Sequence, residues 1–130
     1  MPFLLIVIIA LALIFDFLNG FHDSSNIVAT MISSRAMSPR NALLMSAVAH
    51  FVGPFLFGVA VATTIGSEVV DPAAITSLVI IASLSSSILW YLFTWYFGLP
   101  SSTSHALIGG LVGAVAVSAG IETINLDGLM

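Results

Sequence analysis

Charged side chains divide the chain into apolar stretches of unequal length. Pro2 to Phe15 is uncharged, as is Asn41 to Ser67, and a third uncharged stretch runs from Pro72 to Ile121. About 20 apolar residues cross a bilayer, and an ionised side chain in hydrocarbon costs at least ~2.5 kcal/mol. The pattern therefore predicts membrane helices separated by short polar links.

The third stretch is too long for a single helix. Its strongest break is Gly98-Leu99-Pro100, since proline cannot continue a helix, so this stretch predicts two segments. The first stretch continues through a polar region, and together they predict one long helix interrupted near Gly20. The predicted helices cover residues 3–34, 41–65, 74–97 and 101–120. The expected fold is all-α, a single polytopic integral membrane domain over residues 1–130 with broken or re-entrant helices.

Composition narrows the class of protein. Hydrophobic residues make up 59% of the chain and charged residues 6%, whereas a soluble domain carries about 25% charged residues. The net charge of −4 excludes nucleic-acid binding, and the lack of cysteine in the sequence excludes disulfides and thiolate chemistry. The two basic residues, Arg35 and Arg40, share one link, which the positive-inside tendency places in the cytoplasm. We expect a multi-pass protein of the cell membrane.

One face of the first predicted helix is polar although its surroundings are apolar. At roughly 100° per residue, its polar side chains fall within an arc of about 80°. They are Asp16, Asn19, Asp23, Asn26, Thr30 and Ser34. An acid within a membrane segment indicates a functional site by default. Carboxylate and amide oxygens suit a hard monovalent cation such as Na⁺, so the first four of these residues are candidate ligands of a coupling cation.

Two other interpretations of this polar face stay open. The acids could cap a helix at the membrane surface while the Asn and Ser side chains hold helices together. A carboxylate could instead carry a proton. His50 is similarly ambiguous, because it fits either a cation ligand or a core histidine bonded to a neighbouring helix.

The second unusual stretch is rich in hydroxyl groups. Ser101-Ser102-Thr103-Ser104-His105 follows a proline and precedes an apolar, glycine-rich segment. This order predicts a helix that begins inside the membrane, with its first amides and the positive end of its dipole directed outward. Such a helix start can bind an oxyanion without Lys or Arg. We expect Ser102, Thr103 and Ser104 to be ligands, because four successive hydroxyls exceed what one cap uses.

Residues on either side of this stretch have expected packing roles. Gly109 and Gly113 predict a close-packed seam of small residues between helices. We expect the serines of the preceding segment to form helix–helix contacts. We expect its Trp and Tyr residues to lie at the membrane interface or to pack between helices. These residues are Ser83, Ser85, Ser86, Ser87, Trp90, Tyr91, Trp95 and Tyr96.

The two polar stretches together resemble the PiT-type inorganic phosphate transporters, a family of cation-coupled phosphate permeases. Residues 19–26, Asn-Gly-Phe-His-Asp-Ser-Ser-Asn, are similar to the family's Gly-x-x-Asp-x-x-Asn signature. Residues 98–105, Gly-Leu-Pro-Ser-Ser-Thr-Ser-His, are similar to its Gly-(Leu/Ile)-Pro-x-Ser-(Ser/Thr)-(Ser/Thr)-His element. Both elements occur in the family's order, and the resemblance spans nearly the whole chain.

The resemblance implies a transporter of two inverted repeats, with phosphate and the coupling cations held between them near the membrane midplane. The implied phosphate ligands are Asp23, Ser102, Thr103, Ser104 and His105, and the implied cation ligands include Asp23 and Asn26. His105 would either orient the hydroxyls or contact the anion. His22 and His50 stand where many family members have other residues, so the resemblance assigns them no role.

Family members carry both repeats in one chain, whereas this sequence resembles the first repeat, the N-terminal half. We therefore expect a half-transporter or a piece of a longer protein, with the second repeat supplied by a C-terminal half or by another chain. Transport needs no cofactor and no covalent chemistry. The coupling ion, Na⁺ or H⁺, stays open.

Two other functional classes compete with transport. An intramembrane serine hydrolase has the necessary residue types, but nothing in the sequence resembles a Gly-x-Ser-x-Gly elbow. An accessory membrane subunit would use the same polar residues only to join helices. Phosphate transport is the function that the sequence favours.

Overall fold

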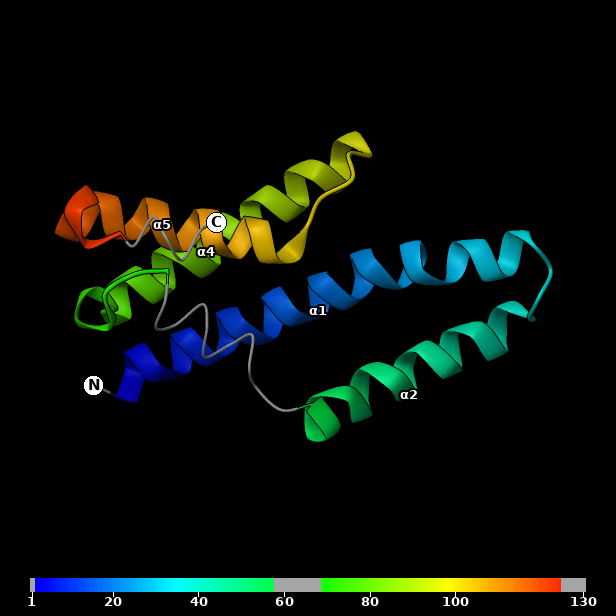
Figure 1. Ribbon diagram of the computed structural model, residues 1–130. Coiled ribbons are helices and arrows are strands. Elements are labelled where there is room, and N and C mark those ends of the chain that lie inside the picture. Colours follow the sequence, from blue (N-terminus) through cyan, green and yellow to red (C-terminus); the bar gives the residue numbers. More distant parts are fainter. Residues whose placement is uncertain (1, 58–68, 125–130) are drawn as a thin grey trace. The chain divides into compact units, whose positions relative to one another are not determined.

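The described residues fold mainly into helices (Figure 1). The computed structural model describes residues 2–57 and 69–124, without the side chains of Asp23 and Phe57. Its helices are α1 (Pro2–Ser33), α2 (Pro39–Phe57), α4 (Ser77–Phe97) and α5 (Thr103–Ala119), with 3₁₀ turns η1 (Pro72–Ala74) and η2 (Ile121–Thr123). The chain divides into two compact units: Met1–Leu18 with Val61–Met130, and Asn19–Ala60.

Helix α1 is continuous through Gly20, where the sequence predicted an interruption. A side chain at Gly20 would meet nothing within 4 Å, so the glycine marks no close approach. Glycine inside a helix costs only about 1 kcal/mol relative to alanine. Breaking the helix would instead leave several backbone groups unpaired in an apolar medium. The expected break at Gly20 is therefore wrong for this structure.

The second unit joins the end of α1 to α2 by a tight turn. Arg35 has a left-handed backbone, with φ of 56°. Beyond it the Ala36 N–H donates to the Met31 carbonyl at 3.2 Å, the six-residue bond that closes a Schellman-type helix end. Helix α2 then begins with proline, and the Ser38 hydroxyl accepts the Asn41 N–H at 3.4 Å. The chain therefore reverses direction within a few residues.

In the first unit, α4 ends where the sequence signals a break. Gly98 adopts the left-handed conformation, with φ of 63°, and its N–H donates to the carbonyls of Thr94 and Trp95. The Leu99 N–H also donates to the Thr94 carbonyl, at 2.8 Å. Pro100 prevents any continuation of the helix. The hydroxyl-rich stretch that follows Pro100 therefore lies at the start of α5.

Polar side chains of α4 hold α5 in place. The Ser87 hydroxyl lies 2.8 Å from the Ser83 carbonyl of its own helix and 3.1 Å from the Ala106 carbonyl of α5. The Ser83 hydroxyl lies 3.5 Å from the Leu107 carbonyl of α5. Both serines are buried. Two of the four serines predicted as helix–helix contacts, Ser83 and Ser87, thus bond across the α4·α5 pair.

The closest approach of the two helices occurs at Gly110, not at the predicted glycines. A Cβ atom at Gly110 would lie 2.6 Å from the Ser86 hydroxyl and 2.8 Å from the Ser83 carbonyl, whereas one at Gly109 or Gly113 would meet nothing within 4 Å. The predicted seam at Gly109 and Gly113 is therefore wrong. The four-residue spacing of Gly109 and Gly113 was detectable, but the face that α5 turns to α4 depends on its partner helix.

A small apolar core fills the end of the first unit where α4 begins and α5 ends. Its buried residues are Val69, Val70, Val79, Leu111 and Val115. An isolated bridge joins Val70 to Ile124, and the Asp71 N–H donates to the Thr123 carbonyl at 3.0 Å. These contacts fix η1 and η2 beside the helix pair.

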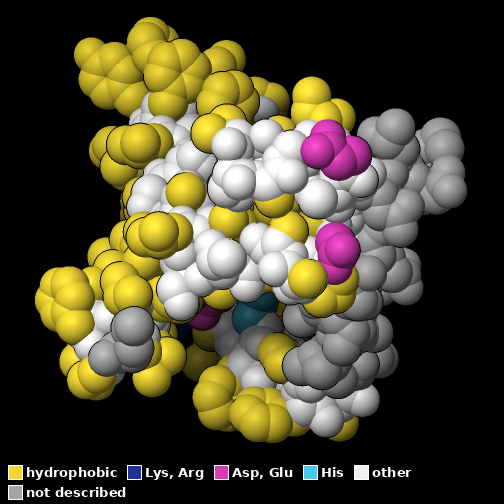
Figure 2. Space-filling view, turned by 90° about the vertical axis from the view of Figure 1, so that its left-hand side faces the viewer, with side chains coloured by type: hydrophobic (Ala, Val, Ile, Leu, Met, Phe, Trp, Pro, Cys, Tyr) yellow, Lys and Arg dark blue, Asp and Glu magenta, His cyan; other side chains and the backbone are white. Residues whose placement is uncertain are grey.

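Most large apolar side chains point outward. Phe3, Phe55 and Val117 are 72%, 78% and 91% exposed, and hydrophobic side chains stand at the surface of the face in Figure 2. In the described part of the chain, α1 and α4 are long and apolar enough to cross a membrane, and α5 is a shorter apolar helix. Apolar surface of this extent is suited to contact with lipid.

We expect Gly110→Ala to destabilise the α4·α5 pair by about 1–3 kcal/mol, because overpacking a close contact forces the helices apart. The matched control is Gly113→Ala on the same helix, whose Cβ would meet nothing within 4 Å. Alanine there should be neutral or should raise stability by up to about 1 kcal/mol through helix propensity. Thermal unfolding of the purified protein in detergent measures both. A Gly110→Ala protein as stable as the wild type would contradict the close approach.

Candidate functional site

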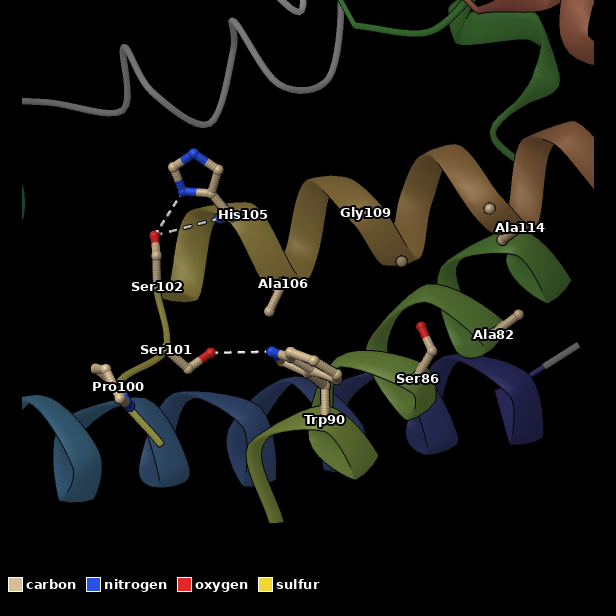
Figure 3. A pocket seen from close by; sticks show the side chains of 12 residues that line it. Ala82, Ser86, Trp90, Pro100, Ser101, Ser102, His105, Ala106, Gly109 and Ala114 are labelled. Atoms are coloured by element: carbon tan, nitrogen blue, oxygen red, sulfur yellow. Dashed lines mark hydrogen bonds between the residues drawn. The ribbon is translucent and has the colours of Figure 1, made fainter. Parts of the chain in front are cut away.

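A pocket of ≈ 670 Å³ opens between α4 and α5 in the first unit (Figure 3). Its α4 side consists of three residues one turn apart, and its α5 side follows one helix face. The lining residues are Ala82, Ser86, Trp90, Pro100, Ser101, Ser102, His105, Ala106, Gly109, Gly110, Gly113 and Ala114. None of them carries a carboxylate, ammonium or guanidinium group, so a ligand would meet hydroxyl groups, one imidazole, one indole and small apolar side chains.

The hydroxyl-rich stretch forms the first turn of α5 at one end of this pocket. Ser102 is the N-cap, with an extended backbone, and its hydroxyl accepts the backbone N–H of His105 at 3.5 Å. The same oxygen lies 2.7 Å from Nδ1 of the His105 ring. Both contacts are visible in Figure 3. Ser102 thus caps the helix and holds the imidazole over its first turn.

A second hydroxyl is held by a residue that the sequence did not mark as part of the site. Trp90 on α4 donates its indole N–H to the Ser101 hydroxyl at 3.0 Å (Figure 3). The Phe93 ring lies against the indole, with ring centroids 5.8 Å apart and planes inclined by 23°. Sequence reasoning placed Trp90 among interfacial or packing aromatics. Its link to Ser101 follows from the antiparallel pairing of α4 with α5, which no local motif encodes.

The predicted phosphate ligands are divided by this geometry. Ser102 and His105 line the pocket, whereas Thr103, which is half-buried, and Ser104, which is exposed, do not. Ser101, omitted from the predicted ligands, does line it. The fifth predicted ligand, Asp23, has its side chain outside the described residues. The ligand roles stay predictions, and among the described residues Ser101, Ser102 and His105 line the pocket.

The predicted cation ligands lie on α1. Asp16 belongs to the first unit and is exposed. Asn19 and Asn26 belong to the second unit, where Asn19 is half-buried and Asn26 is exposed. The backbone of Asp23 is part of the same helix, but its side chain lies outside the described residues. The backbone of all four residues belongs to α1, Pro2–Ser33, and their cation role stays a prediction.

Other polar groups of the second unit are engaged within their own helices. The Ser24 and Ser25 hydroxyls donate to the carbonyls of Phe21 and His22, at 3.3 and 2.8 Å. Nδ1 of His50 lies 2.8 Å from the Ser46 carbonyl one turn earlier. His50 is exposed and bonds within α2, so it is not a core histidine bonded to a neighbouring helix.

The electrostatics of the α5 start favour an anion. The first N–H groups of a helix have no acceptor within the helix, and the aligned peptide dipoles place about half a positive charge at this end. Hydroxyl hydrogens can add further donors. The described pocket has the α5 start at one end and no fixed cation in its lining, an arrangement compatible with the predicted oxyanion site.

Comparison with known proteins identifies the family of the chain. The model of the phosphate transporter family, PHO4, matches residues 19–130. A probable low-affinity inorganic phosphate transporter of Rhizobium meliloti (strain 1021) is 47% identical over 127 residues, covering 98% of this chain and 38% of the relative. The protein of the same description in Bacillus subtilis (strain 168) is 46% identical over 129 residues, with the same coverage.

A more distant relative carries a similar name. The low-affinity inorganic phosphate transporter PitA of Escherichia coli (strain K12) is 40% identical over 116 residues, covering 85% of this chain and 23% of the relative. No solved structure matches the chain. The chain thus spans 38% of the length of the Rhizobium and Bacillus relatives.

Three observations now agree on the class of protein. The first turn of α5 has the chemistry of an oxyanion site, the apolar surface suits a bilayer, and the family model covers most of the chain, including the hydroxyl-rich stretch. Every relative described above is named as an inorganic phosphate transporter, and none as an enzyme. The chain belongs to the phosphate transporter family.

Proposed function

We propose that this chain forms part of a cation-coupled transporter of inorganic phosphate in the cell membrane. The observation that carries the proposal is the hydroxyl-rich start of α5, where Ser101, Ser102 and His105 line one pocket in a member of the phosphate transporter family. Phosphate binds at this pocket. Movement of the membrane helices then exposes the bound phosphate to one side of the bilayer or the other. No covalent step and no resident cofactor are needed.

Neutral donors suit a transport site better than a fixed cation. An Arg or Lys within the bilayer is costly, and a strong ion pair would slow release of the anion. Hydroxyl groups and helix amides bind phosphate through several moderate hydrogen bonds, each worth about 1.5–3 kcal/mol when the acceptor is charged. The anion therefore binds with useful affinity and leaves again.

A coupling cation offsets the free-energy cost of moving the negative charge of phosphate into a cell. Each negative charge carried against an inside-negative potential of about 100 mV costs about 2.3 kcal/mol. A cation bound at the same time offsets this cost and lowers the charge of the loaded site. The polar face of α1, with Asp16, Asn19, Asp23 and Asn26, supplies the oxygen ligands for Na⁺, or a carboxylate for H⁺.

The proposed site is completed by a second, inverted repeat. Transporters of this architecture hold substrate between two repeats and expose it to either side by moving one repeat against the other. This chain spans 38% of the length of the Rhizobium and Bacillus relatives, and the remaining length of those proteins is sufficient for such a repeat. The second repeat would belong either to the same protein or to another chain.

We expect Ser102→Ala to raise the KM for phosphate uptake about tenfold or more, because the hydroxyl lines the pocket, caps α5 and holds His105. The measurement is uptake of radiolabelled phosphate by cells that lack their own phosphate transporters and express the native protein. The matched control is Ser118→Ala, which removes a hydroxyl bonded to the Val115 carbonyl near the other end of α5. An unchanged KM in Ser102→Ala would remove Ser102 from the site.

We expect Asp23→Asn to abolish cation-dependent phosphate uptake while leaving membrane insertion intact. Asparagine keeps the size of aspartate, but it loses the charge that a cation requires and replaces one acceptor oxygen with an amide donor. Uptake is measured with and without Na⁺ and with an imposed proton gradient, which also identifies the coupling ion. Asp71→Asn is the control, because Asp71 is an exposed acid that caps η1, a role that asparagine also fills. Undiminished uptake in Asp23→Asn would refute the assignment.

The same uptake measurements separate transport from the role of an accessory subunit. A subunit whose polar residues only join helices would show no phosphate uptake of its own. Its thermal stability would also be unaffected by added phosphate, whereas a protein that binds phosphate is stabilised by it.

A further inference from the structure

Trp90 and Ser101 form a contact with a defined direction. The indole nitrogen of Trp90 is a hydrogen-bond donor only, so Ser101 is the acceptor in the 3.0 Å bond between them. A serine hydroxyl has one hydrogen and two lone pairs. With one lone pair bonded to the indole, Ser101 retains its hydrogen, which must point away from Trp90.

Both side chains line the same pocket, so this direction matters for a bound ligand. Ser101 lies on the link between α4 and α5, and Trp90 projects from α4 toward it (Figure 3). Phe93 packs on the indole one helical turn later and restricts its rotation. The hydroxyl of Ser101 is thereby fixed at the pocket rim with its hydrogen available for an acceptor.

We propose that Trp90 is a positioning residue that makes Ser101 a hydrogen-bond donor to the transported anion. A freely rotating hydroxyl can direct its hydrogen at any neighbouring acceptor, and a lone pair turned toward phosphate oxygen is repelled by it. The indole N–H occupies one lone pair of Ser101, excludes the orientation in which the hydrogen points at Trp90, and polarises the O–H bond, which strengthens its donation to the anion. Trp90 thus acts on the anion through Ser101, because its single indole N–H is already bonded to that hydroxyl.

The neighbouring hydroxyl has a different set of partners. Ser102 Oγ accepts the backbone N–H of His105 and lies 2.7 Å from the His105 ring nitrogen, so both of its contacts are to one residue. Ser101 has its indole contact on the opposite wall of the pocket. The two serines are therefore oriented independently, one by α5 and one by α4.

The test is Trp90→Phe, which keeps an aromatic ring but removes the indole N–H. We expect the KM for phosphate to rise about three- to tenfold, with the maximal uptake rate within twofold of the wild type. Trp95→Phe is the matched control, because it makes the same change on the same helix at a residue that does not line the pocket; its KM should not change. Membrane content of each variant is measured by immunoblot, so that loss of folded protein is not read as loss of affinity.

A double-mutant cycle then shows whether Trp90 acts through Ser101. Ser101→Ala alone should raise the KM at least as much as Trp90→Phe, and the double variant should be no worse than Ser101→Ala. Additive effects of the two changes, or an unchanged KM in Trp90→Phe, would overturn the proposal.

This inference rests on the proposed function, and the two fail in different ways. If the wild-type protein shows no phosphate uptake and no stabilisation by inorganic phosphate, both are overturned. If the wild type transports phosphate and Ser102→Ala impairs it while Trp90→Phe does not, phosphate transport stands and only the role of Trp90 is lost.

Discussion

The close pairing of α4 with α5 is the constraint on which the rest of the first unit depends. In a bilayer, helices gain little from burying apolar side chains against each other, because lipid is equally apolar. Here the pair is joined by Ser83 and Ser87, which reach carbonyl groups of α5, and by Gly110, which lets the backbones approach. These contacts fix the height and rotation of α5, and with them the position of its first turn.

The same helix pair explains why a pocket exists beside so close a contact. Small residues have two opposite effects along α5. All three glycines line the pocket, but only at Gly110 does the missing side chain permit close contact with α4; a Cβ atom at Gly109 or Gly113 would meet nothing within 4 Å. One glycine-rich segment thus supplies both a tight contact and a cavity.

Local signals in the sequence located the ends of elements but not their partners. Gly98 and Pro100 predicted the break before α5 because both act on their own backbone. Gly20 suggested a break that is absent, since a glycine alone does not outweigh the hydrogen bonds of a helix in an apolar medium. The contact of Trp90 with Ser101 could not be predicted, because it depends on how two helices pair. The cation ligands predicted on α1 rest on their helical spacing and on the acids among them, and their role stays a prediction.

The run of hydroxyl residues in the phosphate-transporter motif need not act as a set of equivalent ligands. A hydroxyl binds an anion only if its hydrogen points toward it, and a donor that occupies one lone pair of the serine favours that orientation. Ser102 has the backbone N–H of His105 for this purpose, and Ser101 has the indole of Trp90. Anion binding by neutral groups is therefore a property of the motif together with the helix packed against it, and α4 is as much a part of the proposed phosphate site as α5.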